Sequence, residues 1–204
     1  MFYRIMIKTF MIAIISTFSC LANASTVDTL FHKANDPVGG NPKGSVTLVE
    51  FFDYQCSHCA NMVTAINDVI KKNPNLRVVF KELPIRGPMS EYAARAALAA
   101  NKQGQYMAFN HALFDNSGDL TESSITDIAK KLGLNMTQFN ADMNSKAITD
   151  QIQGNLKFAE FLGIPGTPAL FIGKSDASDI SNIQYIPGEI NETALQNAIN
   201  QAAK

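Results

Sequence analysis

Two kinds of hydrophobic pattern alternate along the first half of the chain. Residues 45–53 (SVTLVEFFD) and 76–85 (LRVVFKELPI) are nearly continuous apolar runs rich in β-branched and aromatic residues, which predict strands buried on both faces. Residues 56–72, between them, carry apolar side chains at the spacing of one helical face: Cys59, Val63, Ile66 and Ile70. The pattern predicts a strand–helix–strand unit with parallel strands.

A helical pattern fills the middle of the chain, about residues 88–162. An alanine-rich run comes first and stops at Gly104. Thr121 and Asn135 follow, each flanked by apolar residues in the positions expected around the N-cap of a further helix. We therefore expect a block of helices here.

Strand patterns return after this block. Residues 168–173 (PALFIG) and 183–188 (IQYIPG) predict two strands joined by a polar loop, consistent with an antiparallel hairpin. Asn191 is placed to cap a final helix. Residues 25–45 form a short lead-in to the first predicted strand, and residues 36–44 (DPVGGNPKG) within it are turn-rich and poorly suited to regular structure. The layout is βαβ, a helical block, then ββα.

The composition is that of a globular α/β protein. A length of 204 residues favours one domain, and 46% hydrophobic residues suffice for a core without a disulfide framework. The 17 Lys and Arg residues nearly balance the 18 Asp and Glu residues. This charge balance lacks the basic excess typical of nucleic-acid-binding proteins, so no nucleic-acid partner is expected.

The N-terminus has the three parts of a secretory signal peptide. Arg4 and Lys8 form the positive region, residues 10–15 are apolar, and Ala22-Asn23-Ala24 fits a cleavage site. We expect cleavage after Ala24, which leaves residues 25–204 as a single exported domain.

Two other interpretations of this N-terminus are less favoured. A membrane anchor would need an apolar run of roughly 20 residues, and the run here is shorter. Lipidation at Cys20 is the second alternative, but the residues before it lack the leucine of a lipoprotein signal.

Signal cleavage would leave Cys56 and Cys59 as the only cysteines. A stabilising bridge over so short a loop would add little, because the stabilisation grows with loop length. A structural zinc site typically needs four ligands, and the histidines outside the motif are only His32 and His111. The pair is therefore interpreted as a redox-active disulfide, with no metal and no other cofactor.

The start of the predicted helix gives the two sulfurs different chemistry. Cys56 lies where free N–H groups and the helix dipole favour negative charge, so we expect a lowered pKa and an oxidising disulfide. Cys59, one turn further in, is expected to be less exposed and to resolve the mixed disulfide. His58 either adds positive charge beside the Cys56 thiolate or is an exposed loop histidine without a role, and spacing leaves both open.

Glu50 is a carboxylate in a strand otherwise built for burial. A buried carboxylate is costly unless it is paired or protonated, and Lys81 in the next strand is a plausible partner. Two interpretations stay open. Spacing slightly favours a structural ion pair over a buried acid that relays the proton of Cys59.

With these features the chain resembles the DsbA-type thiol–disulfide oxidoreductases of the bacterial periplasm, within the thioredoxin superfamily. The matching segments follow the family's order along the chain: VEFFDYQCSHC (49–59), KELPI (81–85), AARAALAA (93–100) and LGIPGTPALFIG (162–173). The resemblance implies a thioredoxin-like fold with a helical domain inserted at about 88–162.

The resemblance also implies residue roles. Pro168 would follow a cis peptide bond beside the cysteines, which would leave the backbone of Thr167 free to pair with an extended substrate. Glu50 would be the family's buried acid and Lys81 its partner. The sequence departs from the pattern at Ser57, where the best-known oxidases have proline, so Ser57 and His58 are expected to set how oxidising the disulfide is.

The expected activity is the introduction of disulfide bonds into exported proteins in the periplasm. The expected partners are reduced, unfolded exported proteins and a DsbB-like membrane oxidase that passes electrons to quinone. A disulfide isomerase or reductase on the same fold is the main alternative. Such relatives are commonly dimers built through an added N-terminal segment, and after signal cleavage only about 20 residues would precede the first predicted strand, so we expect a monomer. A non-catalytic metal-binding or chaperone protein is a further alternative, but the 8 methionines form no metal-binding cluster.

Overall fold

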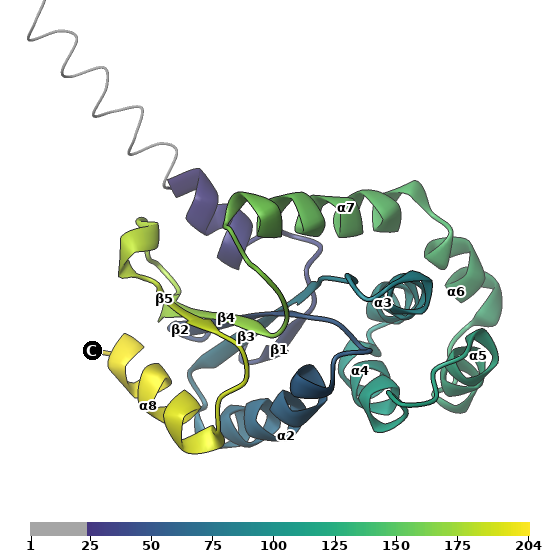
Figure 1. The fold of residues 1–204 in the computed structure, drawn as a ribbon, viewed down its shortest axis with the longest axis horizontal. Helices are drawn as coiled ribbons and strands as arrows, with labels where there is room; N and C mark the ends of the chain where they lie inside the picture. Colours follow the sequence, from purple (N-terminus) through teal and green to yellow (C-terminus); the bar gives the residue numbers. More distant parts are fainter. Residues whose placement is uncertain (1–23) are drawn as a thin grey trace, which may run out of the picture.

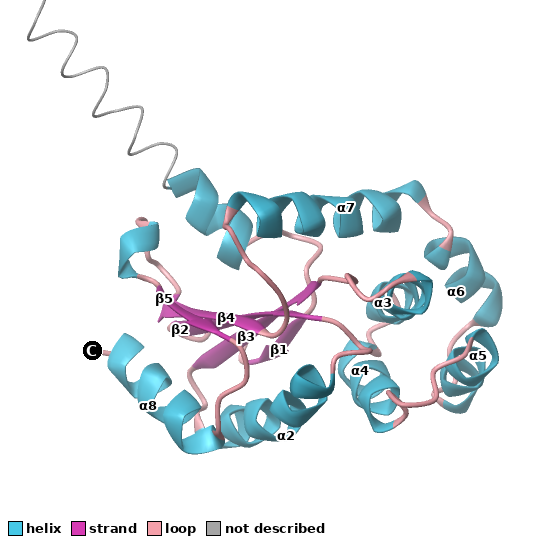
Figure 2. Ribbon diagram, viewed as in Figure 1, coloured by secondary structure: helices cyan, strands magenta, loops and turns pink. Residues whose placement is uncertain are grey.

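The computed structural model describes residues 24–204. The predicted signal peptide, residues 1–24, lies outside the described residues except for Ala24. The described chain forms a five-stranded sheet with helices on both faces (Figures 1 and 2). The strand order is β1-β3-β2-β4-β5. Their bounds are Val38–Gly40 (β1), Val46–Phe52 (β2), Leu76–Glu82 (β3), Ala169–Lys174 (β4) and Gln184–Pro187 (β5).

The centre of the sheet is the predicted strand–helix–strand unit. β2 and β3 run parallel, with Val46 opposite Leu76, and α2 (Ser57–Lys72) connects them. β2 is buried along its whole length because β3 and β4 flank it and helices cover both faces. The carboxyl ends of β2 and β3 therefore lie together at the edge of the sheet where α2 begins.

The C-terminal part adds the predicted ββα unit. β4 pairs antiparallel with β2, and β5 pairs antiparallel with β4. Asn191 caps α8 (Glu192–Ala202) by accepting a hydrogen bond from the backbone of Ala194. Since Ala169 lies opposite Phe51, the start of β4 is brought to the end of β2, next to the cysteine motif.

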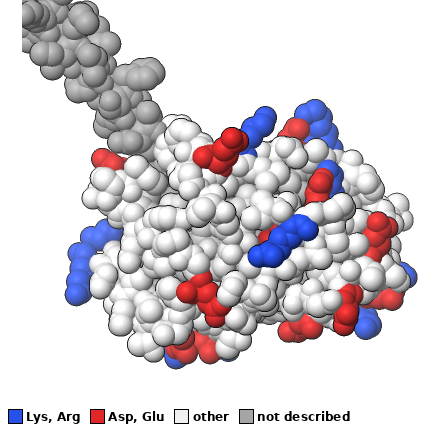
Figure 3. Space-filling model, in the orientation of Figure 1, with Lys and Arg blue, Asp and Glu red and all other residues white. Residues whose placement is uncertain are grey.

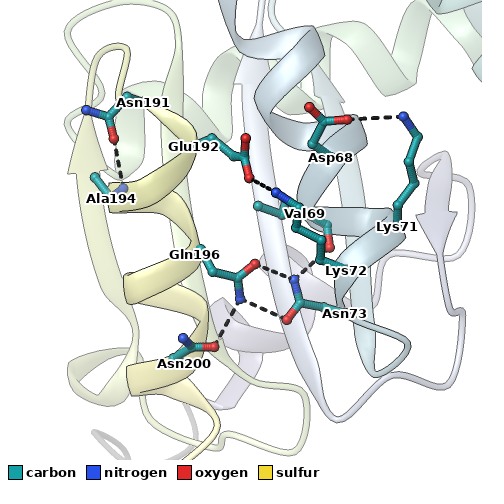
Figure 4. Close-up of polar contacts among 10 residues, drawn as sticks. All are labelled: Asp68, Val69, Lys71, Lys72, Asn73, Asn191, Glu192, Ala194, Gln196 and Asn200. Carbon is teal, nitrogen blue, oxygen red and sulfur yellow. Dashed lines mark hydrogen bonds and ion pairs between the residues drawn. The ribbon is translucent and has the colours of Figure 1, made fainter.

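α2 and α8 cover one face of the sheet, and polar contacts join them at the end of α2 that lies away from the cysteines (Figure 4). Lys72 forms an ion pair with Glu192, and Asn73 exchanges hydrogen bonds with Gln196. These contacts fix the C-terminal end of α2 against α8.

A block of helices separates β3 from β4, as the sequence predicts. Thr121 and Asn135 are N-caps, accepting hydrogen bonds from the backbone N–H groups of Ser124 and Gln138. The alanine-rich α3 packs against all the other helices of the block. Within residues 24–204, no helix combines the length and apolarity needed to cross a membrane. The helices of the block are α3 (Pro88–Asn101), α4 (Tyr106–Asp115), α5 (Glu122–Lys131), α6 (Met136–Met143) and α7 (Lys146–Phe161).

The segment before β2 is more regular than the sequence indicates. Residues 24–31 are helical, and β1 pairs antiparallel with β3. A strand of three residues, two of them glycine, is too short to show the hydrophobic pattern of a strand, and it forms because it pairs with β3. Gly40 ends it at φ +67°, where an added Cβ would lie 2.5 Å from the carbonyl oxygen of Leu76, so this turn requires glycine.

Side chains of β2 alternate between two hydrophobic cores, as the pleat of a strand dictates. Leu48 and Phe52 belong to the core with α2 and the helical block, whereas Val49 and Phe51 belong to the core with α7 and the helical residues 24–31. By this alternation Glu50 points toward the same side as α2.

Candidate active site

The two cysteines lie in the first turn of α2. Cys56 is the N-cap residue, with extended backbone angles of φ −93° and ψ 114°, and Cys59 lies one turn into the helix. Both are free thiols, and both are buried. The backbone N–H of Cys56 donates to the carbonyl oxygen of Asp53 at 3.0 Å, which closes the turn between β2 and the helix.

Cys56 faces the loop that leads into β4. The peptide bond between Thr167 and Pro168 is cis, and the Cys56 thiol donates a hydrogen bond to the Thr167 carbonyl oxygen at 3.3 Å. Beside this contact is an open groove of about 440 Å³, lined by residues that include His58, Thr167, Pro168 and Glu189. The structure thus brings Thr167 and Pro168 to the thiol, where the resemblance places them.

The surroundings shift the pKa values of the two thiols in opposite directions. Burial would raise the pKa of Cys56, but hydrogen bonding by the Thr167 side chain and by Cys59, together with the positive charge of Arg86, outweighs it, so the pKa is lowered. Burial raises the pKa of Cys59 well above the ordinary range, and the charge of Glu50 adds to this. Cys56 is therefore the thiol that ionises, and Cys59 is the one that keeps its proton.

Glu50 is a buried acid electrostatically coupled to both cysteines. Only 4% of its surface is exposed. Burial raises its pKa to about 8, and the charge of Cys56 contributes to the shift. Among the described residues, none donates a hydrogen bond to the Glu50 carboxyl or pairs with it. A carboxyl group in such a position can hold or release a proton near neutral pH.

The prediction that Lys81 pairs with Glu50 is wrong. In the parallel pairing of β2 with β3, Glu50 lies opposite Phe80, and Lys81 lies opposite Phe51. The Lys81 side chain therefore enters the core on the other face of the sheet, where it pairs with the buried Asp36 and donates to the Thr29 carbonyl oxygen at 2.7 Å. Lys81 is part of a structural ion pair remote from the cysteines.

The two residues between the cysteines point outward. The His58 ring lies 2.8 Å from a carboxylate oxygen of Glu189, measured from Nδ1, and Asn61 donates to the same oxygen. These hydrogen bonds lower the pKa of Glu189. Ser57 is exposed at the first position of α2. His58 therefore contacts Glu189 at the rim of the groove and makes no hydrogen bond to the Cys56 sulfur in the described structure.

Two residues of the site escaped the sequence analysis, Arg86 and Asp53. Arg86 lies in the loop after β3, with its guanidinium Nη2 3.7 Å from the Cys56 sulfur. The buried Asp53 follows β2 and accepts hydrogen bonds from the loop that carries Arg86. The available signal was their position, because the carboxyl ends of parallel neighbouring strands meet at one edge of a sheet.

A buried polar cluster lies on the same side of the sheet as Glu50. The carboxylate of Glu82 accepts hydrogen bonds from the hydroxyl groups of Tyr54 (3.0 Å) and Tyr106 (2.7 Å), and Asn110 donates to Tyr54 at 3.1 Å. Burial raises the pKa of Glu82 well above its ordinary value. The sequence analysis did not single out this acid, which lies directly after Lys81 in the chain.

The described part of the chain offers no set of side chains for binding a metal ion. Residues 24–204 contain no group of three or more His, Cys, Asp or Glu side chains that could hold a metal ion.

Comparison with known proteins identifies the fold. The family model of the DsbA-like thioredoxin domain matches residues 47–200. A thioredoxin-like oxidoreductase from Silicibacter pomeroyi superposes with a TM-score of 0.75 at 38% identity, covering 86% of this chain and 96% of that chain. The thiol-disulfide exchange protein alpha-DsbA2 from Wolbachia pipientis gives a TM-score of 0.76 at 28% identity, covering 90% and 97%.

Curated relatives match over one segment only. The Na(+)/H(+) antiporter NhaA 1 of Salinispora arenicola is 27% identical over 157 residues, which is 76% of this chain and 24% of that protein. The chain thus spans about a quarter of the length of the curated relatives that it matches. Such a match concerns that segment and not ion transport by the rest of the antiporter. The fold, the paired cysteines beside a cis-proline and the family match agree, and the chain belongs to the DsbA-like thioredoxin domain family.

Proposed function

We propose that the protein is a dithiol oxidase that introduces disulfide bonds into exported proteins. The observation that carries this proposal is the opposite shift of the two thiol pKa values, lowered at Cys56 and raised at Cys59. A stabilised Cys56 thiolate favours the reduced form of the pair, and an enzyme with a stable reduced form holds an oxidising disulfide.

The reaction proceeds by two exchanges. A substrate thiolate attacks the Cys56 sulfur, the Cys56–Cys59 bond breaks, and Cys59 leaves with the electron pair. A second thiolate of the substrate then attacks the substrate sulfur of the mixed disulfide, and Cys56 leaves as a thiolate. The substrate gains one disulfide and loses two electrons, and the enzyme becomes the dithiol.

Glu50 supplies the proton that Cys59 needs when it leaves. The Cys59 thiolate is strongly disfavoured in its buried position. With a pKa of about 8, Glu50 holds a proton near neutral pH and is electrostatically coupled to Cys59. Transfer of the proton from the carboxyl to the sulfur leaves Cys59 neutral and Glu50 as a carboxylate, which then takes up a proton from solvent.

The groove beside Pro168 is the substrate site in this proposal. An extended substrate pairs with the backbone of Thr167, which holds the substrate's cysteine near Cys56. Acidic and basic side chains are interspersed on the face shown in Figure 3. A face without a dominant charge suits an enzyme that accepts reduced, unfolded proteins of varied sequence.

The setting follows from the N-terminal signal and the chemistry. The signal-peptide pattern at the N-terminus supports a periplasmic setting, where disulfides persist. The dithiol must be reoxidised there, and we propose a DsbB-like membrane oxidase that passes the two electrons to quinone. The disulfide itself is the redox group, and no further cofactor takes part.

Refolding of two forms of one substrate tests this function. The oxidised enzyme is expected to convert a reduced, unfolded protein with several cysteines into its disulfide-bonded form in stoichiometric turnover. It is expected to rescue a scrambled, fully oxidised form of the same protein only slowly. Faster rescue of the scrambled form than oxidation of the reduced form would identify an isomerase instead.

A further inference from the structure

The positive charge nearest to the reactive sulfur comes from a residue outside the cysteine motif. Arg86 Nη2 lies 3.7 Å from the Cys56 sulfur and donates to it. The other candidate cation, His58, has its Nδ1 bound to Glu189 at 2.8 Å. A histidine held by a carboxylate has its charge largely offset when protonated, so it contributes little field at the sulfur.

Arg86 is fixed by its backbone even though its side chain reaches solvent. One carboxylate oxygen of Asp53 accepts from the backbone N–H groups of Ile85 (2.8 Å) and Arg86 (2.9 Å). The other oxygen accepts from the Gln55 N–H at 2.7 Å and the Ser90 hydroxyl at 2.7 Å. Asp53 therefore joins the turn before Cys56, the loop carrying Arg86 and the first turn of α3.

These hydrogen bonds of Asp53 fix the backbone of Arg86 relative to the turn before Cys56. Only 1% of the Asp53 surface is exposed, and its four hydrogen bonds satisfy a charge that would otherwise be costly to bury. The Asp53 carboxylate accepts hydrogen bonds both from the turn before Cys56 and from the backbone of Arg86. The Arg86 side chain therefore extends toward the Cys56 sulfur from a backbone whose position is fixed.

We propose that Arg86, positioned by Asp53, is the cation that stabilises the Cys56 thiolate, whereas His58 serves the groove through Glu189. Arg86 touches the reacting sulfur directly, and Asp53 acts through it. The proposal concerns the thiolate itself. It therefore holds whether the enzyme oxidises or isomerises its substrates, and a failure of the oxidase proposal leaves it standing.

The expected size follows from Coulomb's law. Two unit charges about 4 Å apart attract by about 1 kcal/mol under water-like screening, and by more where solvent is partly excluded. Loss of that attraction corresponds to roughly a fivefold smaller equilibrium constant for oxidation of glutathione by the protein. For a two-electron couple this is a potential about 20 mV less oxidising.

The test compares Arg86→Gln, Arg86→Lys and His58→Gln with a matched control, Lys174→Gln. Lys174 is exposed at the far end of β4, about 15 Å along the strand from the site, and its substitution removes the same unit of charge. Two quantities are measured for each folded variant. They are the pKa of Cys56, from the ultraviolet absorbance of the thiolate, and the equilibrium constant with glutathione.

The proposal predicts that Arg86→Gln raises the pKa of Cys56 and lowers the equilibrium constant roughly fivefold. Arg86→Lys, which keeps the charge, should recover most of both, and His58→Gln should change each less than Arg86→Gln does. The proposal is overturned if Arg86→Gln matches the Lys174→Gln control, or if His58→Gln produces the larger change in both quantities.

Asp53 is tested through a double variant. Asp53→Asn replaces one accepting oxygen by a donor and should move both quantities in the direction of Arg86→Gln. If Asp53 acts through Arg86, the change in the double variant will be no larger than that of Arg86→Gln alone. Additive changes would contradict the positioning role of Asp53, and the Arg86 variants would still decide the role of Arg86.

Discussion

At the residue scale, the division of labour between the two cysteines comes from where the backbone places them. Cys56 is the N-cap of α2, facing Thr167 and Arg86, and Cys59 is one turn deeper in the core beside Glu50. The motif alone identifies the two reactive sulfurs. Their different chemistry depends on neighbours that lie about 30 and more than 100 residues away in the chain.

Serine variants of the two cysteines should have different consequences. Cys56→Ser removes the attacked sulfur and is expected to abolish exchange with a reduced substrate. Cys59→Ser removes the resolving thiol, so mixed disulfides between Cys56 and substrate should accumulate. Electrophoresis without reductant detects them as adducts. Adducts formed by Cys56→Ser instead would reverse the assignment.

Glu50→Gln is expected to change how stability depends on pH. The pKa of Glu50 rises from 4.5 to about 8 on folding, so the folded state holds the proton more tightly than the unfolded state. The free energy of unfolding should therefore fall as the pH rises across this window. Glutamine does not titrate, so at pH 8 the variant should be more stable, by on the order of 3–5 kcal/mol.

Denaturant unfolding of the reduced protein between pH 4.5 and pH 8.5 measures this effect. Glu160→Gln, on the exposed side of α7, is a control that removes an acid without changing the core. Parallel pH profiles for the natural protein and Glu50→Gln would show that the buried carboxyl does not titrate as described.

At the element scale, strand register decides which side chains meet. Glu50 and Lys81 look like natural partners in sequence because each interrupts an apolar strand. The register of β2 with β3 sends them to opposite faces of the sheet, and register depends on pairing across the sheet. It could not be obtained from either strand alone.

The buried pair of Lys81 and Asp36 should matter for stability and not for redox chemistry. Asp36→Asn leaves the Lys81 ammonium buried without a counter-charge, which typically costs about 3–5 kcal/mol. The variant is expected to unfold at lower denaturant concentration and to keep the potential of the natural protein. A large change in reduction potential with unchanged stability would indicate instead that Lys81 acts on the cysteine pair.

Elements with strong local signals were predicted from sequence, and those made by long-range pairing were not. The strands β2, β3, β4 and β5 and the caps at Thr121, Asn135 and Asn191 follow from local residue choice. β1 depends on β3, and the helical residues 24–31 lie in the lead-in segment, for which no element was predicted. The contact of Arg86 with Cys56 was missed for the same reason, since no local pattern encodes proximity between two loops.

At the scale of the whole molecule, the sheet and its helices bring three separate segments to one edge. They are the end of β2 with Cys56, the loop after β3 with Arg86, and the entry to β4 with Pro168. The contacts that stabilise the Cys56 thiolate exist only in the folded protein. A stabilised thiolate should therefore raise the free energy of unfolding of the reduced protein.

The reduced protein is therefore expected to melt at a higher temperature than the oxidised protein near pH 9, the ordinary pKa of a thiol, where the stabilisation from the lowered pKa of Cys56 is largest. For a chain of this size, each kcal/mol corresponds to about 2–4 °C. A lowered thiol pKa contributes stability above its unfolded value and loses it as the pH falls through the folded value. The difference in melting temperature between the two states should thus shrink on acidification. Glu50 is present in both states and largely cancels. A higher melting temperature for the oxidised protein would contradict the expected stabilisation.

The reduction potential of the Cys56–Cys59 pair tests the central claim most directly. Equilibration with glutathione at pH 7, followed by quantitation of the reduced and oxidised protein, gives the value. An oxidase with a stabilised Cys56 thiolate should have a potential well above the roughly −270 mV of thioredoxin, at about −200 mV or higher. A potential near that of thioredoxin would contradict the account, because the reduced pair would then act as a reductant.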